Sequence, residues 1–76
     1  MTKEEKAQIA LKELKEYFPE CQKVKLSGYW KGNDVFEAAT EGLPELIGIP
    51  SCVIIGNDGS ATFPSISIMS DSEFPI

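Results

Sequence analysis

The spacing of apolar residues changes at Pro19, and this change limits the chain to one leading helix followed by strands. Before Pro19 the apolar residues recur at the spacing of one helix face, and Thr2 and Glu5 fit a capping box. Proline pushes the residue before it out of the helical region, so the helix should end there. The sequence therefore predicts a helix over residues 3–18 that packs through one stripe, made of Ala7, Ala10, Leu11, Leu14 and Phe18.

After Pro19, apolar and polar residues alternate as they do in half-buried strands. Residues 23–30 follow this period of two, which places Trp30 on the face that packs against the helix and Tyr29 on the outer face. On this pattern, the core between helix and sheet should consist of Leu11, Leu14, Leu26, Trp30, Val53, Ile55 and Phe63.

The register of the first hairpin depends on the length of its turn. A two-residue turn at Gly32 and Asn33 would pair Tyr29 with Phe36, whereas a three-residue loop would pair Trp30 with Phe36. The three-residue loop sends apolar side chains inward and charged ones outward, so we predict that register.

A second hairpin follows a long connection. Residues 52–55 are a wholly apolar strand, and the turn signal at residues 57–59 should bring residues 60–63 back beside it. Residues 66–68 alternate isoleucine with serine, which predicts one short final strand. Residues 71–76 are expected to form a flexible tail, held at most by Phe74.

The predicted fold is a single α+β domain over residues 1–76. It consists of one N-terminal helix packed on an antiparallel four- or five-stranded sheet built from two hairpins. This element order is similar to the helix-on-meander layouts of cystatin-like and PepSY-type domains, whose members are often binders or inhibitors. Residues 48–59 resemble the proline-strand-turn segment of thioredoxin-like proteins, but the chain has no CxxC motif, so no redox activity is implied.

The residue types that the chain lacks exclude several chemistries. The chain has neither histidine nor arginine, so it cannot form a Ser-His-Asp or Cys-His arrangement, or clamp a phosphate with a guanidinium group. Its two cysteines are too few for a structural zinc site, and no glycine-rich phosphate loop occurs. We therefore expect a protein that is not an enzyme and that binds no metal or cofactor.

Charge is distributed unevenly along the chain. All seven basic residues are lysines between Lys3 and Lys31, while acidic residues continue to Glu73, and the net charge is −5. This acidity opposes binding to nucleic acids and to anionic membranes. Without an apolar leader or membrane-length segment, the sequence predicts a cytoplasmic protein with reduced cysteines.

These observations favour a small acidic module that binds a protein partner, acts as an inhibitor or associates with itself. Two alternatives remain compatible with the sequence. One is a small-molecule-binding protein or minor enzyme that uses cysteine or carboxylate chemistry, and the other is a structural domain without separable activity. Aromatic and basic residues on the outer sheet face and apolar residues in the long connection are the candidate partner-binding residues, namely Tyr29, Lys23, Lys25, Leu46, Ile47 and Ile49.

Overall fold

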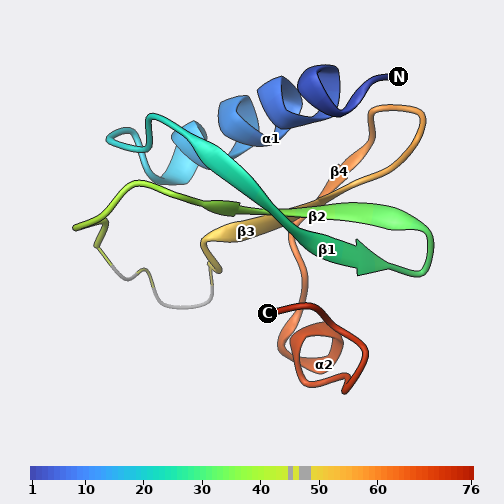
Figure 1. Cartoon of the computed structure of the whole chain (residues 1–76). Helices are drawn as coiled ribbons and strands as arrows, with labels where there is room; N and C mark the ends of the chain where they lie inside the picture. Colours follow the sequence, from blue (N-terminus) through green and yellow to red (C-terminus); the bar gives the residue numbers. More distant parts are fainter. Residues whose placement is uncertain (45, 47–48) are drawn as a thin grey trace.

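The computed structural model describes residues 1–44, 46 and 49–76, and it has three layers (Figure 1). A four-stranded antiparallel sheet of order β1-β2-β3-β4 lies between the N-terminal helix on one face and the C-terminal segment on the other. This confirms the predicted α+β class and the helix-on-sheet arrangement. The elements are α1 (Lys3–Tyr17), β1 (Val24–Trp30), β2 (Asn33–Ala38), β3 (Cys52–Ile55), β4 (Ala61–Thr62) and α2 (Ile66–Met69).

Helix α1 begins at the predicted capping box. The Thr2 hydroxyl accepts a hydrogen bond from the Glu5 amide at 3.1 Å, and the Glu5 carboxylate accepts one from the Thr2 amide at 3.0 Å. Both bonds satisfy backbone donors that the first helical turn leaves unpaired. Ala10 and Leu14 are fully buried and Phe18 nearly so, which confirms that the predicted stripe faces the sheet.

The register predicted for the first hairpin is wrong. Lys31 and Gly32 form a two-residue turn with φ angles of 49° and 80°, and Trp30 therefore pairs with Asn33. Two consecutive positive φ angles are what a type I′ hairpin turn requires. Farther along the hairpin, Leu26 pairs with Phe36 and Gly28 with Val35, which leaves Ser27 as an extra residue in β1. Ser27 thus forms a β-bulge that the alternation pattern did not reveal.

The bulge reverses the predicted faces of Trp30 and Tyr29. Beyond Ser27, Trp30 packs with Val35 and Phe74 on the face opposite α1. Tyr29 pairs with Asp34 and lies on the helix side, where its hydroxyl accepts a hydrogen bond from Lys3. Leu26, expected in the core, is 37% exposed. One inserted residue exchanges the two sheet faces for every later residue of the strand. The wrong faces predicted for Trp30 and for Tyr29 therefore have the same cause.

The second hairpin follows the prediction. In β3, Val53 and Ile55 are fully buried in the cluster beneath α1, and Ala61 and Phe63 pack against that cluster. Ile55 pairs with Ala61 across the turn, where Gly59 has a φ of 85°. The other two residues of β3 face the opposite side, so this strand supplies side chains to both cores.

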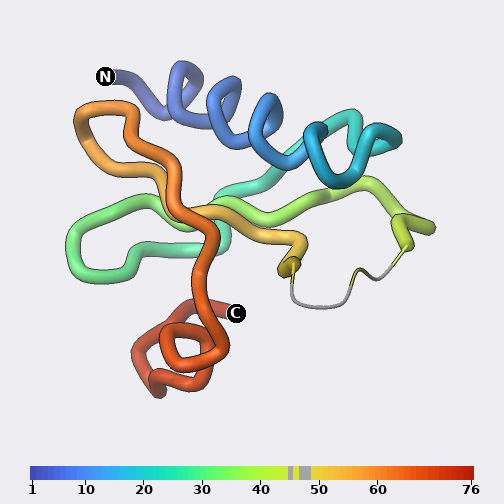
Figure 2. The backbone as a smooth tube through the Cα atoms, turned by 180° about the vertical axis from the view of Figure 1, so that it is seen from behind, coloured from blue at the N-terminus to red at the C-terminus, as the bar shows by residue number. Residues whose placement is uncertain are grey.

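The C-terminal segment contains a short helix where a final strand was predicted. The Ser65 hydroxyl accepts a hydrogen bond from the Ile68 amide at 3.3 Å, which caps α2. Alternation over three residues is too short to distinguish a strand from a helical turn. Figure 2, seen from behind, shows this segment crossing beneath the sheet on the side away from α1. Phe74, the predicted tether, is buried, and its ring meets that of Trp30 edge to face, with centroids 6.2 Å apart.

Candidate functional site

The connection between β2 and β3 forms one end of the molecule. Its ends are attached to the sheet, because the Ala38 amide donates to the Ser51 carbonyl and the Ala39 amide donates to the Lys23 carbonyl, both at 2.9 Å. The Thr40 hydroxyl accepts from the Gln22 amide at 2.9 Å. Of the apolar side chains in the connection, Leu43, Leu46 and Ile49 pack against the core beneath α1.

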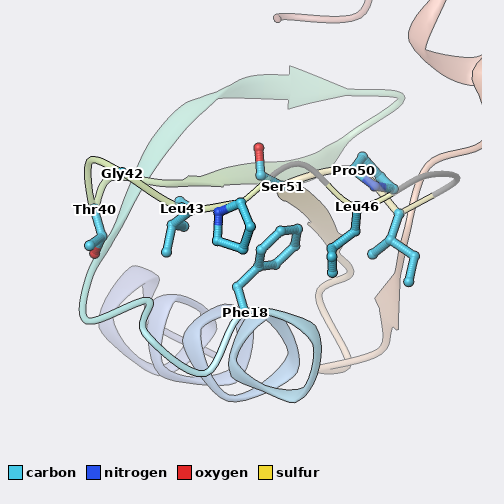
Figure 3. A pocket seen from close by; sticks show the side chains of 10 residues that line it. Phe18, Thr40, Gly42, Leu43, Leu46, Pro50 and Ser51 are labelled. Carbon is cyan, nitrogen blue, oxygen red and sulfur yellow. The ribbon is translucent and has the colours of Figure 1, made fainter.

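A hollow of about 480 Å³ lies between this connection and the end of α1. Figure 3 shows Phe18 pointing from the helix end toward the connection, with Leu43 and Leu46 among the side chains around it. Thr40 and Ser51 contribute hydroxyl groups, and no charged side chain is among the described residues that line it. We call this the first hollow; it is open to solvent, and polar atoms make up more of its exposed lining than apolar atoms do.

A second hollow of about 440 Å³ adjoins the first. It lies between the connection and the C-terminal segment, where Pro64, Ile66 and Met69 line it. Three residues line both hollows and form the ridge between them: Leu46, Ile49 and Pro50. The Ile49 amide donates a hydrogen bond to the Leu46 carbonyl at 3.3 Å, which joins two of these residues directly. In the part of the chain that the structure describes, the two hollows therefore have no charged lining side chain and share Leu46, Ile49 and Pro50 as a common wall.

The structure brings together only part of the predicted set of partner-binding residues. Leu46 and Ile49 both belong to the ridge, whereas Ile47 lies outside the described residues. Neither hollow includes Tyr29, Lys23 or Lys25 among its lining residues. The two halves of the predicted set therefore belong to separate surfaces.

The outer-face grouping of Tyr29 with Lys25 is wrong, because the bulge separates their side chains. Lys25 pairs with Glu37 in the register, and its ammonium lies 2.9 Å from that carboxylate. Tyr29 is instead held beside the start of α1, where the Lys3 ammonium donates to its hydroxyl at 2.6 Å and lies 4.5 Å from its ring centroid. Tyr29 is nevertheless 55% exposed.

Sequence reasoning missed a buried polar cluster at the other end of the molecule. The Lys6 ammonium donates to Asp34 at 3.1 Å and to the side-chain oxygen of Asn57 at 2.8 Å, and Lys3 donates to the second Asp34 oxygen at 3.1 Å. Burial disfavours the ionised carboxylate, but the two lysines outweigh this and hold the pKa of Asp34 below its usual range. The sequence feature that could have indicated this cluster is the position of Lys6. It lies four residues before Ala10 and therefore on the same helix face as the apolar stripe.

The two cysteines are both free and buried, on opposite sides of the sheet. Cys21 is completely buried beneath α1. Burial, with a smaller effect of the Glu37 charge, raises the pKa of Cys52 to about 11. A thiol in this state is a poor nucleophile at neutral pH. The geometry therefore does not favour cysteine chemistry.

Comparison of the chain with models of protein families, with curated proteins and with solved structures found no match. Within the described residues, no group of three or more acidic or cysteine side chains is placed to hold a metal ion. No helix in that part of the chain has the length and apolar character needed to cross a membrane.

Proposed function

We propose that this protein is a non-catalytic binding module that holds a segment of a partner protein across the two hollows. The observation that carries the proposal is the ridge of Leu46, Ile49 and Pro50, because these residues line both hollows. A segment laid over the ridge would place an uncharged polar side chain in the first hollow and an apolar one in the second, whose exposed lining is mainly apolar. A few such anchor side chains supply much of the affinity in protein interfaces.

The shape of the surface supports a protein segment over an enclosed small ligand. Sites for small molecules usually cover most of the ligand surface, whereas both hollows here are open. The described lining carries no charge, so it provides no ionic partner for a phosphate or carboxylate. A pair of uncharged side chains, one polar and one apolar, meets both conditions.

The proposal is tested by selecting binders from a random peptide display library against the whole chain. Ile66, which is 76% exposed, lines the second hollow, and exposed Ser51 lines the first. Neither Ile66→Asp nor Ser51→Arg removes a buried side chain, so both variants should fold. Each places a charge where an uncharged anchor would bind and should weaken the binding of selected peptides by about tenfold or more.

Ile76→Asp is the matched control, since Ile76 is 58% exposed and lines neither hollow. It should bind the selected peptides as the parent does. The proposal fails if no peptide is enriched, or if enriched peptides bind the parent and all three variants equally.

A further inference from the structure

Strand β1 presents an open sheet edge that neither hollow includes. Within the described structure its neighbouring strand is β2, on one side, so the backbone groups along its other side have no strand partner. The opposite edge of the sheet, β4, contains two residues, whereas β1 contains seven. An open edge of this length can accept an additional strand from another protein.

The edge is basic on a protein that is otherwise acidic. Residues 21–33 contain no aspartate or glutamate, and they carry Lys23, Lys25 and Lys31. Lys25 is paired with Glu37, whereas Lys23 and Lys31 form no ion pair with the described residues. Every residue after Lys31 is neutral or acidic, so the positive charge is concentrated along this strand and α1.

Two aromatic rings lie at the hairpin end of the same edge, each beside a lysine. The Lys3 ammonium lies 4.5 Å from the centroid of the Tyr29 ring, and the Lys31 ammonium lies 4.7 Å from the centroid of the Trp30 ring. These contacts orient the cations by attraction to the ring faces. A carboxylate arriving at this end would therefore meet the Lys31 ammonium already positioned, whereas the Lys3 ammonium is paired with Asp34.

We propose that the outer edge of β1 binds an extended acidic segment of a partner protein as an additional strand. Main-chain hydrogen bonds would supply the pairing, and carboxylates on the segment would meet Lys23 and Lys31. A second copy of β1 is a poor occupant because its own lysines would face these lysines. The bulge at Ser27 twists the edge and restricts pairing to a short segment. This inference does not depend on the proposed function of the hollows.

The register identifies an amide that should report strand addition. Trp30 and Asn33 flank a two-residue turn, so they form a pair whose backbone groups face each other. The backbone groups of the preceding residue, Tyr29, then point away from β2. Binding of a strand should slow hydrogen exchange at the Tyr29 amide, whereas contact through side chains alone should not.

The experiment uses the whole chain carrying Ile66→Asp and Ser51→Arg, so that both hollows are blocked. Selection from the same peptide library at low salt should then enrich glutamate- and aspartate-rich peptides that protect the Tyr29 amide. The double variant Lys23→Glu with Lys31→Glu should bind these peptides about tenfold more weakly or worse. Added salt should weaken their binding to the protein that keeps both lysines.

Lys12→Glu with Lys15→Glu is the matched control, because it changes net charge by the same amount at two exposed positions on α1. It should cause a much smaller loss of affinity. Three results would overturn the inference: no acidic peptide is enriched, both double variants lose affinity equally, or binding leaves exchange at the Tyr29 amide unchanged. Each of these results leaves the proposed function of the hollows intact.

Discussion

At the scale of single residues, the buried contact between Lys6 and Asp34 joins α1 to β2. Both side chains are almost inaccessible to water, and their charged atoms lie 3.1 Å apart. Removing one member of a buried ion pair leaves the other charged and poorly compensated. We predict that Asp34→Asn lowers the free energy of unfolding at pH 7 by about 3–5 kcal/mol, measured by urea denaturation. A double variant, Lys6→Met with Asp34→Asn, should recover part of this loss.

The same carboxylate predicts how stability depends on pH. Because the folded state lowers the pKa of Asp34, its contribution is complete above the unfolded value of about 3.9 and is lost as pH falls through the lower folded value. The difference in unfolding free energy between the parent and Asp34→Asn should therefore be constant from pH 7 to about 5 and shrink below about 4. A difference that stays constant down to pH 2 would contradict this assignment.

Leu14 and Leu26 provide a matched pair for testing where the core lies. Leu14 is fully buried between α1 and the sheet, whereas Leu26 is 37% exposed although the alternation pattern placed it in the core. Leu14→Ala should destabilise the protein by about 2–5 kcal/mol, because it opens a cavity in a closed site. Leu26→Ala should cost roughly 1 kcal/mol or less, since its site is partly in solvent. Equal costs in urea denaturation would mean that α1 packs differently.

At the scale of elements, the C-terminal segment is held to the sheet by close approach at Gly28. A Cβ atom added there would lie 2.6 Å from Cβ of Pro75, and the φ angle of 154° is itself unfavourable for other residues. Gly28→Ala should therefore displace the segment and expose the Trp30 ring. Because the chain has one tryptophan, its fluorescence emission should shift to longer wavelength.

Gly32→Ala is the control for this prediction. Gly32 also has a positive φ, of 80°, but a Cβ there would meet no atom within 4 Å. Its replacement should cost about 1 kcal/mol of stability through backbone strain alone and leave the tryptophan emission unchanged. The same red shift in both variants would show that backbone strain, and not contact with Pro75, causes it.

At the scale of the whole molecule, the two cores share two strands, β2 and β3, and β2 supplies Phe36 to one core and Val35 to the other. Val53 and Ile55 of β3 face α1, while Cys52 and Ile54 face the C-terminal segment. Loss of either core removes packing from β3, so both should unfold in one cooperative transition. Urea unfolding curves followed by helix circular dichroism and by Trp30 fluorescence should coincide. Separate midpoints would mean that the C-terminal segment detaches before α1 does.

Local signals predicted the elements whose pattern is long or whose turn chemistry is distinctive. The capping box and Pro19 define α1 to within one residue, because helix starts and stops depend on groups a few positions away. Asn57, Asp58 and Gly59 identify the second hairpin for the same reason. Of the candidate binding site, Leu46 and Ile49 were predicted because strongly apolar residues are unusual in a connection and require some contact to cover them.

The tertiary structure decided the features that depend on distant neighbours. Whether Ser27 is inserted as a bulge depends on which side chains each sheet face can accept, so alternation alone placed Trp30 and Tyr29 on the wrong faces. The pairing of Lys6 with Asp34 joins residues 28 positions apart. By itself, the sequence determined one helix, two hairpins and an apolar connection, since these follow from short-range sterics and hydrogen bonding. The face that each strand residue occupies, and the two hollows, arise only when those elements pack against one another.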